Sequence, residues 1–317
     1  MNLLIIGGSV FVGRHMVEAA LARGHRVTVF NRGTHAADLA VGVEQVRGDR
    51  DVDLAALAGR HFESVIDCCA YTPEQITRAA AVLSHLVDHY VFISTISVYK
   101  SFPPGKPYDE TAPVGDGDDY GGRKARAEAV LEAAFPGRAI CVRPGLIAGP
   151  YDPTGRLTYW PVRVAKGGTV LAPGRPGRPV QWMDARDLAC WCVALAERKT
   201  TGVFNAPGAT DTMANFLEAC RLACNPQAAF KWMPDAQLLA ADVAPWTGMP
   251  LWIPENDEAF GGMLLGSEER ARAAGLSTRP WQDTLRDTLQ WAQAAGEKAL
   301  GIAGIAHERE SALLATL

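Results

Sequence analysis

The chain opens with a short apolar run that leads directly into a glycine-rich turn. Residues 3–6 read Leu-Leu-Ile-Ile, which indicates a strand buried on both faces, as in a covered parallel sheet. The turn at residues 7–13 reads Gly-Gly-Ser-Val-Phe-Val-Gly, and a helical pattern follows it up to Gly24. Residues 26–30 then form a second apolar strand. A strand-helix-strand unit of about thirty residues is typical of dinucleotide-binding folds.

The positions of this turn have separate physical roles. Gly7 permits the tight bend, and Gly13 lets the helix pack closely against the strand. Val10 stands in the middle, where a glycine is usual. The N–H groups at the start of the helix can bind a pyrophosphate, although glycines in such a turn can also serve the backbone alone. We expect these cofactor contacts: Gly7, Ser9, Phe11, Val12 and Gly13.

The rest of the chain predicts an α/β fold with a doubly wound parallel sheet of the Rossmann type, because helical and strand patterns alternate. We expect residues 1–150 to form this core and residues 180–224 to return to it. Residues 151–179 and 225–294 are irregular and predict a smaller substrate lobe. Residues 295–317 predict a tail with a frayed helix. With 317 residues, 48% of them hydrophobic, the chain is long enough for both parts.

Charge and cysteine content exclude several classes of function. A net charge of −4 offers no basic excess for nucleic acid or for an anionic membrane. The apolar stretch near the N-terminus is too short for a signal peptide or a membrane span, so we expect a cytoplasmic protein. Seven cysteines are scattered through predicted helices and strands, and Cys220 and Cys224, which share a helical face, have no accompanying histidines. We expect reduced thiols and no metal site.

A tyrosine and a lysine four residues apart indicate proton-transfer chemistry. Tyr120 and Lys124 fall on one face of a helix predicted over residues 120–134. A phenol has an ordinary pKa near 10, and an adjacent ammonium group favours the phenolate and lowers that pKa. The lysine could also hold a nicotinamide ribose. Taken alone, a tyrosine and a lysine at this spacing are more often an amphipathic pair on a surface helix.

The fifth strand is predicted over residues 89–94, and hydroxyl side chains lie at its end. The sequence there reads Ser94-Thr95-Ile96-Ser97. These hydroxyls are expected at the carboxyl edge of the sheet, where ligands bind in such folds. A hydroxyl at this edge can bond a substrate oxygen during proton transfer. Its simpler role is a hydrogen-bonded turn.

Several motifs occur together in the order found in one known family. They are Gly7-Gly8-x-x-Phe11-Val12-Gly13, Gly48-Asp49, Ser94-Thr95-x-Ser97-Val98-Tyr99, Tyr120-x-x-x-Lys124, Arg143-Pro144-Gly145, Asp184-x-x-Asp187-Leu188-Ala189 and a closing Arg279-Pro280-x-x-x-Thr284. Together they resemble the extended short-chain dehydrogenase/reductase superfamily, in its NAD(P)-dependent epimerase/dehydratase family. The likeness spans nearly the whole chain. It is partly atypical, because Val10 replaces a glycine and Asp184 stands where many sugar-nucleotide members carry histidine.

The resemblance implies roles for individual residues. It makes Tyr120 the catalytic acid/base, Lys124 its pKa modulator and ribose ligand, and Thr95 the group that orients the substrate. It places three further residues beside the cofactor: Asp49, Ala70 and Pro144. Related enzymes often dimerise through the helix that carries the Tyr/Lys pair, so we expect a homodimer.

The end of the second strand indicates which cofactor is bound. Folds that prefer NAD carry an acidic residue there for the ribose 2′-hydroxyl, whereas a nearby arginine suits the 2′-phosphate of NADP. This chain reads Asn31-Arg32 at that point and has no carboxylate. We expect NADP(H) to be preferred and NAD(H) to be possible, with Arg32 on the phosphate and Arg14 assisting. The simpler alternative is that Arg32 is a solvated turn residue.

Candidate substrate contacts come from large aromatics and polar groups in segments near the cleft. Five of the eight tryptophans fall in or beside the predicted substrate lobe, where they could wall a pocket for a ring-bearing ligand or simply pack. The candidates are Tyr71, Ser97, Arg156, Trp160 and Trp182.

The leading hypothesis is therefore an NADPH-dependent reductase of a small carbonyl compound, ring-bearing or sugar-like, with a Tyr/Lys/Thr proton relay. The nearest alternative is a redox-neutral nucleotide-sugar epimerase or dehydratase, although dehydratases usually add acidic residues beside the catalytic threonine and Ile96-Ser97 supplies none.

A binding protein is the second class of function. It would be an NADP(H) sensor or an RNA-associated factor, by analogy with chloroplast stem-loop-binding proteins that share an atypical glycine turn. The intact Tyr/Lys pair disfavours a sensor without catalysis, and the acidic net charge disfavours RNA binding. A structural protein without cofactor is the last possibility.

Overall fold

A seven-stranded sheet forms the centre of the molecule. The computed structural model describes residues 1–34, 40–52, 54–299, 301 and 303–317. Every neighbouring pair of strands in this sheet is parallel, in the order β11-β6-β5-β4-β1-β2-β3. The strands are β1 (Asn2–Ile6), β2 (Arg26–Asn31), β3 (Glu44–Arg47), β4 (Ser64–Asp67), β5 (Tyr90–Ile93), β6 (Ala139–Pro144) and β11 (Gly202–Ala206). The strand order reverses between β1 and β4, the point at which such sheets bind ligands.

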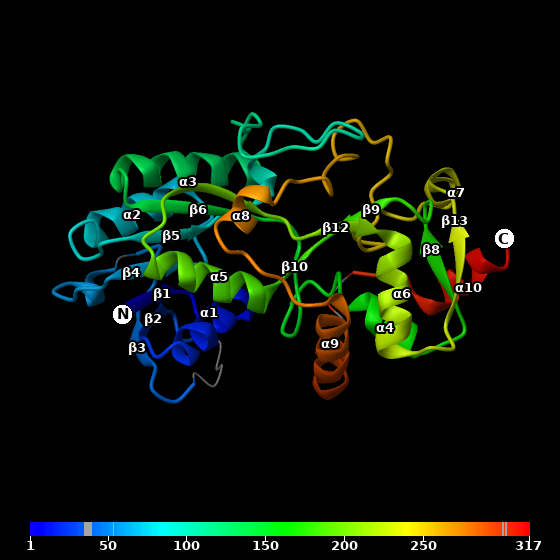
Figure 1. Cartoon of the computed structure of the whole chain (residues 1–317), viewed down its shortest axis with the longest axis horizontal. Coiled ribbons are helices and arrows are strands. Elements are labelled where there is room, and N and C mark those ends of the chain that lie inside the picture. Colours follow the sequence, from blue (N-terminus) through cyan, green and yellow to red (C-terminus); the bar gives the residue numbers. More distant parts are fainter. Residues whose placement is uncertain (35–39, 53, 300, 302) are drawn as a thin grey trace.

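Helices cover both faces of the sheet, which confirms the predicted doubly wound architecture. Helices α1 (Phe11–Ala22) and α5 (Ala185–Glu197) lie on one face, and α2 (Pro73–Leu83) and α3 (Tyr120–Ala134) on the other (Figure 1). The apolar run of β1 shows why, because Leu3 and Ile5 pack on the first side and Leu4 and Ile6 on the second. A strand with two buried faces needs apolar residues at every position.

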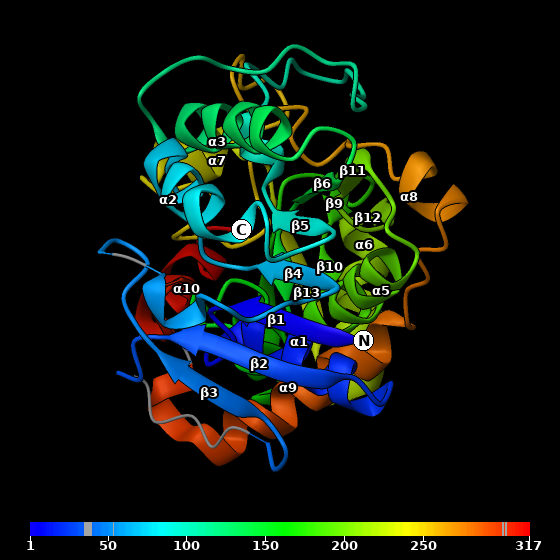
Figure 2. The same cartoon turned by 90° about the vertical axis from the view of Figure 1, so that its left-hand side faces the viewer.

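The second lobe has its own hydrophobic core. It contains two short strand pairs, β8 (Thr169–Pro173) with β13 (Ala229–Met233) and β9 (Pro179–Gln181) with β12 (Thr210–Thr212). The helices around them are α4 (Tyr159–Ala165), α6 (Met213–Cys224), α7 (Asp235–Ala240), α9 (Trp281–Ala295) and α10 (His307–Leu314). Figure 2 views the molecule from the sheet side, with this lobe behind. Three short elements complete the chain: β7 (Ile147–Ala148), β10 (Met183–Asp184) and α8 (Glu269–Ala273).

The segment 180–224 differs from the predicted return to the core. Helix α5 and strand β11 lie with the sheet, whereas β9, β12 and α6 belong to the second lobe. The reason is that Phe216 of α6 packs edge-on against Trp160, with ring centroids 6.1 Å apart. A helical period alone cannot tell which of two cores its apolar face will meet.

The C-terminal tail is docked rather than frayed, which corrects the prediction. Glu310 of α10 is fully buried and pairs with Arg163 of α4. Its second carboxylate oxygen accepts a hydrogen bond from the backbone N–H of Leu171, at 2.9 Å. The tail therefore closes one side of the second lobe. The ion pair joins residues 147 positions apart, a distance over which local pattern carries no information.

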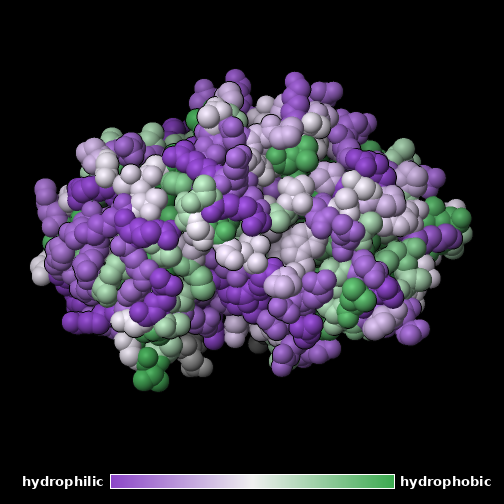
Figure 3. All heavy atoms as spheres, in the orientation of Figure 1, coloured by the Kyte–Doolittle hydropathy of each residue, from purple (hydrophilic) through white to green (hydrophobic). Residues whose placement is uncertain are grey.

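The surface in Figure 3 is mostly hydrophilic, with hydrophobic residues scattered singly or in small groups over that face. None of the described helices combines the length and the apolarity needed to cross a membrane.

Candidate active site

A cavity of about 530 Å³ lies at the carboxyl edge of β1, β2 and β4. Its wall is made by the glycine turn, the end of β2, and the segments after β3 and β4. Eight of the predicted cofactor contacts line it: Gly7, Ser9, Phe11, Val12, Gly13, Asn31, Arg32 and Asp49. Tyr71, a predicted substrate contact, also lines it. The size and position of the cavity fit the adenosine and pyrophosphate part of a dinucleotide.

The backbone of the turn explains why its glycines are needed. A Cβ atom on Gly13 would lie 2.5 Å from the backbone nitrogen of Gly8, so only glycine allows α1 to begin this close to β1. Val10, which replaces the middle glycine, lines the cavity and is 45% exposed, so it leaves the cavity open. Helix α1 has no side-chain N-cap and no acidic residue in its first turn. Its N-terminus is thus available to an anion such as a pyrophosphate.

The loop after β2 carries Arg32, which is exposed beside the cavity. Asn31 shapes this loop, because its Oδ1 accepts the N–H of Gly33 at 3.0 Å. The predicted assistance of Arg14 is not supported. Its guanidinium pairs with Glu18 at 2.9 Å and lies 4.1 Å from the ring centre of Tyr151.

A buried ion pair, which the local sequence pattern does not predict, forms the floor of the cavity. The guanidinium of Arg50 donates to both carboxylate oxygens of Asp67, at 2.6 and 2.9 Å, and the Tyr90 hydroxyl donates to the same carboxylate at 2.6 Å. Arg50 holds the pKa of Asp67 below its ordinary value, although burial acts in the opposite direction. The available signal was a carboxylate at the end of the apolar strand 64–67.

This pair is connected to Lys124 through the segment after β4. Asp67 Oδ1 accepts the N–H of Cys69 at 3.1 Å, and the Lys124 ammonium donates to the carbonyl oxygen of Ala70 at 2.8 Å. The same ammonium donates to the carbonyl of Ile93 at the end of β5, at 2.7 Å. Lys124 therefore ties the cavity wall to the neighbouring strand.

Tyr120 is the first residue of α3 and lies beside the cavity wall. Asp119 caps the helix by accepting the N–H of Gly122 at 2.8 Å. The Tyr120 ring lies 6.5 Å from the ring of Tyr71, which lines the cavity. Burial raises the pKa of Tyr120, and a hydrogen bond with the Thr95 hydroxyl acts in the opposite direction. The group that lowers the pKa of Tyr120 is thus Thr95. The sequence had indicated Lys124 for this role, but its ammonium donates to two carbonyl oxygens instead.

The two glycines that follow Tyr120 let the start of α3 pack closely against two backbone segments, the loop that carries Thr95 and the loop before the helix. A Cβ on Gly121 would lie 1.9 Å from the carbonyl oxygen of Ser97, and one on Gly122 would lie 1.9 Å from that of Gly117. Both glycines are buried inside a helix, where glycine is otherwise unfavourable by about 1 kcal/mol. Close approach of the two segments accounts for their presence.

Gly121→Ala is expected to destabilise the protein by about 1–3 kcal/mol and to lower its activity, because the new methyl group displaces the start of α3 from Ser97. Thermal unfolding and kcat measure the two effects. Gly117→Ala is the matched control, since a Cβ there finds its nearest atom at 3.7 Å. Equal behaviour of the two variants would show that close approach of α3 is unimportant.

The remaining predicted residues are placed as follows. Ser97 donates its N–H to Thr95 Oγ1 at 3.1 Å, next to Tyr120. Ala70 and Pro144 are buried beside the site and do not line the cavity, so their cofactor contacts remain predictions. Arg156 lies 5.8 Å from the ring centre of Trp246 in the second lobe.

Trp160 and Trp182 serve the core of the second lobe, and we no longer expect them to contact substrate. Trp160 is fully buried and donates its indole N–H to the carbonyl of Pro250 at 3.1 Å. Trp182 is 3% exposed and packs against Trp281 at 5.3 Å between ring centres. This is the packing role that large aromatics also allow.

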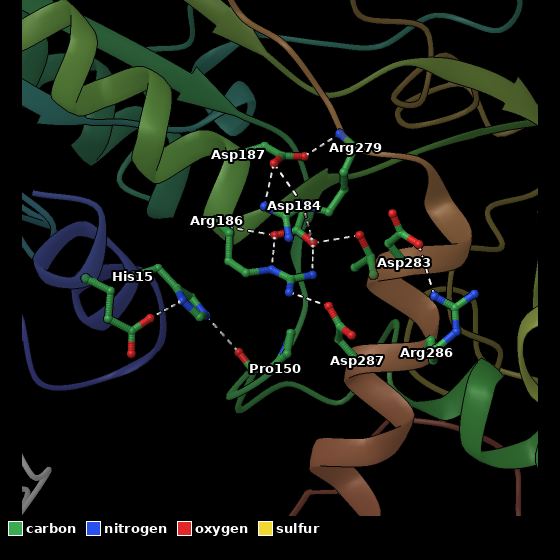
Figure 4. Close-up of polar contacts among 11 residues, drawn as sticks. His15, Pro150, Asp184, Arg186, Asp187, Arg279, Asp283, Arg286 and Asp287 are labelled. Atoms are coloured by element: carbon green, nitrogen blue, oxygen red, sulfur yellow. Dashed lines mark hydrogen bonds and ion pairs between the residues drawn. The ribbon is translucent and has the colours of Figure 1, made fainter. Parts of the chain in front are cut away.

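A polar network joins the two lobes next to the start of α5 (Figure 4). Asp184 caps α5 by accepting the N–H of Arg186 at 2.7 Å, and the hydroxyl of Thr284 on α9 donates to it at 2.6 Å. Arg279 donates its Nε to Asp187 at 2.8 Å. Asp184, where many sugar-nucleotide members carry histidine, therefore holds α9 against the core.

Fold and site together define a Rossmann-type protein with a dinucleotide cavity beside a Tyr/Lys helix. The model of the NAD dependent epimerase/dehydratase family matches residues 3–206. The chain belongs to this family.

Individual known proteins are similar to the chain. It is 27% identical over 259 residues to the epimerase family protein SDR39U1 of Bos taurus, covering 76% of this chain and 86% of that protein. It is 30% identical over 176 residues to a 2-alkyl-3-oxoalkanoate reductase of Stenotrophomonas maltophilia, covering 48% and 52%. A UDP-glucuronic acid 4-epimerase from Bacillus cereus, solved in complex with NAD, shares the fold with a TM-score of 0.69 at 14% identity, over 94% of this chain and 98% of that one.

Proposed function

We propose that the protein is an NADPH-dependent reductase that converts a carbonyl group of a small, ring-bearing molecule to an alcohol. The observation that carries the proposal is the position of Tyr120, a partly exposed phenol whose ring lies 6.5 Å from the ring of the cavity-lining Tyr71. A phenol is protonated at neutral pH, so Tyr120 is available as a proton donor there. Reduction needs a donor at this position, whereas oxidation needs a base.

The chemistry of the proposed step balances with the groups available. Bound NADPH supplies a hydride to the carbonyl carbon, and Tyr120 gives its proton to the carbonyl oxygen. The alcohol is released and the phenolate regains a proton from solvent. Thr95 supports the transfer, because its hydroxyl bonds the same phenol and favours the phenolate that forms.

The end of β2 supports NADPH over NADH. It has no carboxylate for a ribose hydroxyl, and it carries the exposed guanidinium of Arg32. The likeness to a 2-alkyl-3-oxoalkanoate reductase is consistent with reduction of a carbonyl. The exposed rings of Tyr71 and Tyr120 favour a ring-bearing substrate.

A second candidate function is a redox-neutral epimerase of a nucleotide sugar. The shared fold with a UDP-glucuronic acid 4-epimerase in complex with NAD favours it. Dehydration is disfavoured, because Thr95 is followed by Ile96, which is buried and apolar, and by Ser97.

Cofactor stoichiometry separates these two functions. The purified protein is mixed with NADPH and a panel of aliphatic, cyclic and aromatic ketones and aldehydes, and in parallel with NAD and UDP-glucuronic acid. A reductase oxidises one NADPH for each alcohol formed. Conversion of the sugar nucleotide to its epimer without net change in the cofactor would replace the proposal with the second candidate.

Cofactor affinity is expected to fall by about tenfold as the pH rises from 7 to 9.5. Burial lowers the pKa of Lys124 to about 8. The ammonium form has three N–H donors, two of which bond Ala70 and Ile93, so one is left for a ribose hydroxyl. The neutral amine has only two donors. Loss of the proton above pH 8 therefore removes the donor for the cofactor.

Fluorescence titration with NADPH at a series of pH values checks this expectation. Lys124→Met is the control, because it lacks the ammonium and should bind weakly with no dependence on pH in this range. An unchanged affinity of the wild-type protein between pH 7 and 9.5 would contradict the role given to Lys124.

A further inference from the structure

We propose that Arg47, at the end of β3, forms a two-arginine site with Arg32 for the 2′-phosphate of the cofactor. The inference rests on the proposed preference for NADPH and adds the residue that sets its strength. Arg47 lies outside both the glycine turn and β2, the two segments whose sequence indicates a cofactor site.

The geometry of the sheet brings Arg47 to the cavity. Strands β2 and β3 are parallel, and Asn31 and Arg47 are direct partners in their register. Directly opposed residues in neighbouring strands project to the same face, so the side chain of Arg47 lies on the face of Asn31. Both residues end their strands at the carboxyl edge. Asn31 lines the cavity, and Gly48, the residue after Arg47, lines it too.

The guanidinium of Arg47 lies against the loop that carries Arg32. A Cβ on Gly33 would lie 3.0 Å from Arg47 Nε and 3.4 Å from its Cζ. Gly33 lines the cavity and has a φ of +70°, which glycine adopts without strain. The bare backbone of Gly33 thus leaves space for the planar guanidinium at the rim of the cavity.

Both arginines have their charge available to a ligand. Arg32 and Arg47 are exposed, and within the described part of the chain neither side chain has a hydrogen-bond or ion-pair partner. Other arginines nearby are neutralised: Arg14 by Glu18, Arg50 by Asp67 and Arg60 by Glu44. Two unpaired guanidinium groups beside one cavity rim favour a doubly charged anion.

Asn31 and the two carboxylates that line the cavity, Asp49 and Asp51, are already engaged in hydrogen bonds. Asn31 Oδ1 accepts hydrogen bonds from Gly33 N–H and from Gln45 Nε2 at 2.9 Å, and its amide donates to the carbonyl of Gly7 at 3.3 Å. Asn31 is therefore committed to shaping the turn. Two carboxylates line the cavity on the segment after β3. Asp49 accepts the N–H of Asp51 at 2.9 Å, and Asp51 accepts Gln75 Nε2 at 2.7 Å.

This arrangement distinguishes a phosphate from a hydroxyl. The 2′-phosphate of NADPH offers several acceptor oxygens and a negative charge to the two guanidinium groups. NADH offers only a neutral hydroxyl at the same place. Loss of one of the two arginines should therefore weaken the binding of NADPH and leave the binding of NADH almost unchanged.

Equilibrium titration of the full-length protein tests the proposal. NADPH and NADH are titrated by fluorescence, and 2′,5′-ADP, which lacks the nicotinamide half, is used as a competitor. Arg47→Gln is expected to raise the Kd for NADPH and for 2′,5′-ADP about tenfold and to change the Kd for NADH by less than about twofold. Arg26→Gln is the matched control, because it removes an exposed charge from the opposite end of β2.

The outcomes separate the failure of this inference from the failure of the proposed function. An unchanged ratio of NADPH to NADH affinity in Arg47→Gln, with the wild type preferring NADPH, would overturn the role of Arg47 alone. Equal affinity of the wild type for the two cofactors would overturn the preference and this inference together. A protein that reduces no carbonyl compound would still give these affinities, so the two-arginine site is tested without turnover.

Discussion

Tyr120→Phe is expected to lower kcat for carbonyl reduction by about 10²- to 10⁴-fold, the range that a positioned general acid supplies. The variant keeps the aromatic ring, so the contact with Tyr71 and the start of α3 are preserved. It removes only the proton that the carbonyl oxygen receives. The affinity for NADPH should stay within about threefold, because the effect is confined to the transition state.

Steady-state kinetics and NADPH titration on the same preparations measure both quantities. Tyr151→Phe is the control, since its ring contacts His15 and Trp291 outside the Tyr/Lys helix. It should have a normal kcat. Retention of most turnover by Tyr120→Phe would remove Tyr120 as the proton donor and with it the proposed mechanism.

Arg50→Met is expected to destabilise the protein by about 3–5 kcal/mol, because it leaves the carboxylate of Asp67 buried without its cation. Asp67 is fully buried and its side chain has Arg50 as its ion-pair partner within the described residues. For a chain of this size the midpoint of thermal unfolding should fall by on the order of 10 °C. Arg60→Met is the matched control. It breaks a pair with Glu44 that is exposed to solvent, so its effect should be below about 1 kcal/mol.

The pH dependence of this loss has a defined sign. In the wild type the folded pKa of Asp67 is lowered, so its stabilisation is present above the unfolded pKa of about 3.9 and is lost as the pH falls through the folded value. In Arg50→Met the hydrogen bonds from Tyr90 and Cys69 remain, but loss of the Arg50 charge leaves burial less opposed, so the pKa of Asp67 rises relative to the wild type. The stability difference between the proteins should therefore be largest near neutral pH and should shrink toward about pH 4.

A double variant separates the charge effect from packing. Arg50→Met/Asp67→Asn should recover part of the stability lost in Arg50→Met, because the buried charge is gone. Equal stabilities of the single and double variants at neutral pH would contradict the account of the cavity floor.

Local patterns in the sequence were sufficient to predict the central sheet and the helices that cover it. The apolar run at residues 3–6 fixed β1, and the helix predicted over residues 120–134 is α3 with the same bounds. The glycine turn was equally informative. Its pattern predicted that the position of Gly13 has no space for a side chain, and the structure shows this close approach. Each of these signals depends on neighbours within a few residues or one turn of helix.

The features that the sequence did not predict depend on long-range contacts. Arg50 meets Asp67 across two strands, and Glu310 reaches Arg163 from the far end of the chain. Trp160 was predicted to contact the substrate because large aromatic residues often line binding pockets. In the structure its side chain is fully buried in the core of the second lobe. Burial of an individual side chain is decided by tertiary packing, which composition and period do not encode.

The most direct test of the central claim follows a labelled hydride. The protein is incubated with NADPH carrying deuterium at the transferable position of the nicotinamide, together with a carbonyl compound that it turns over, and the alcohol is analysed by mass spectrometry. The account predicts one deuterium on the carbinol carbon of each product molecule, in equal amount to the NADP formed. A product without deuterium, or a substrate converted while the cofactor stays unchanged, would contradict it.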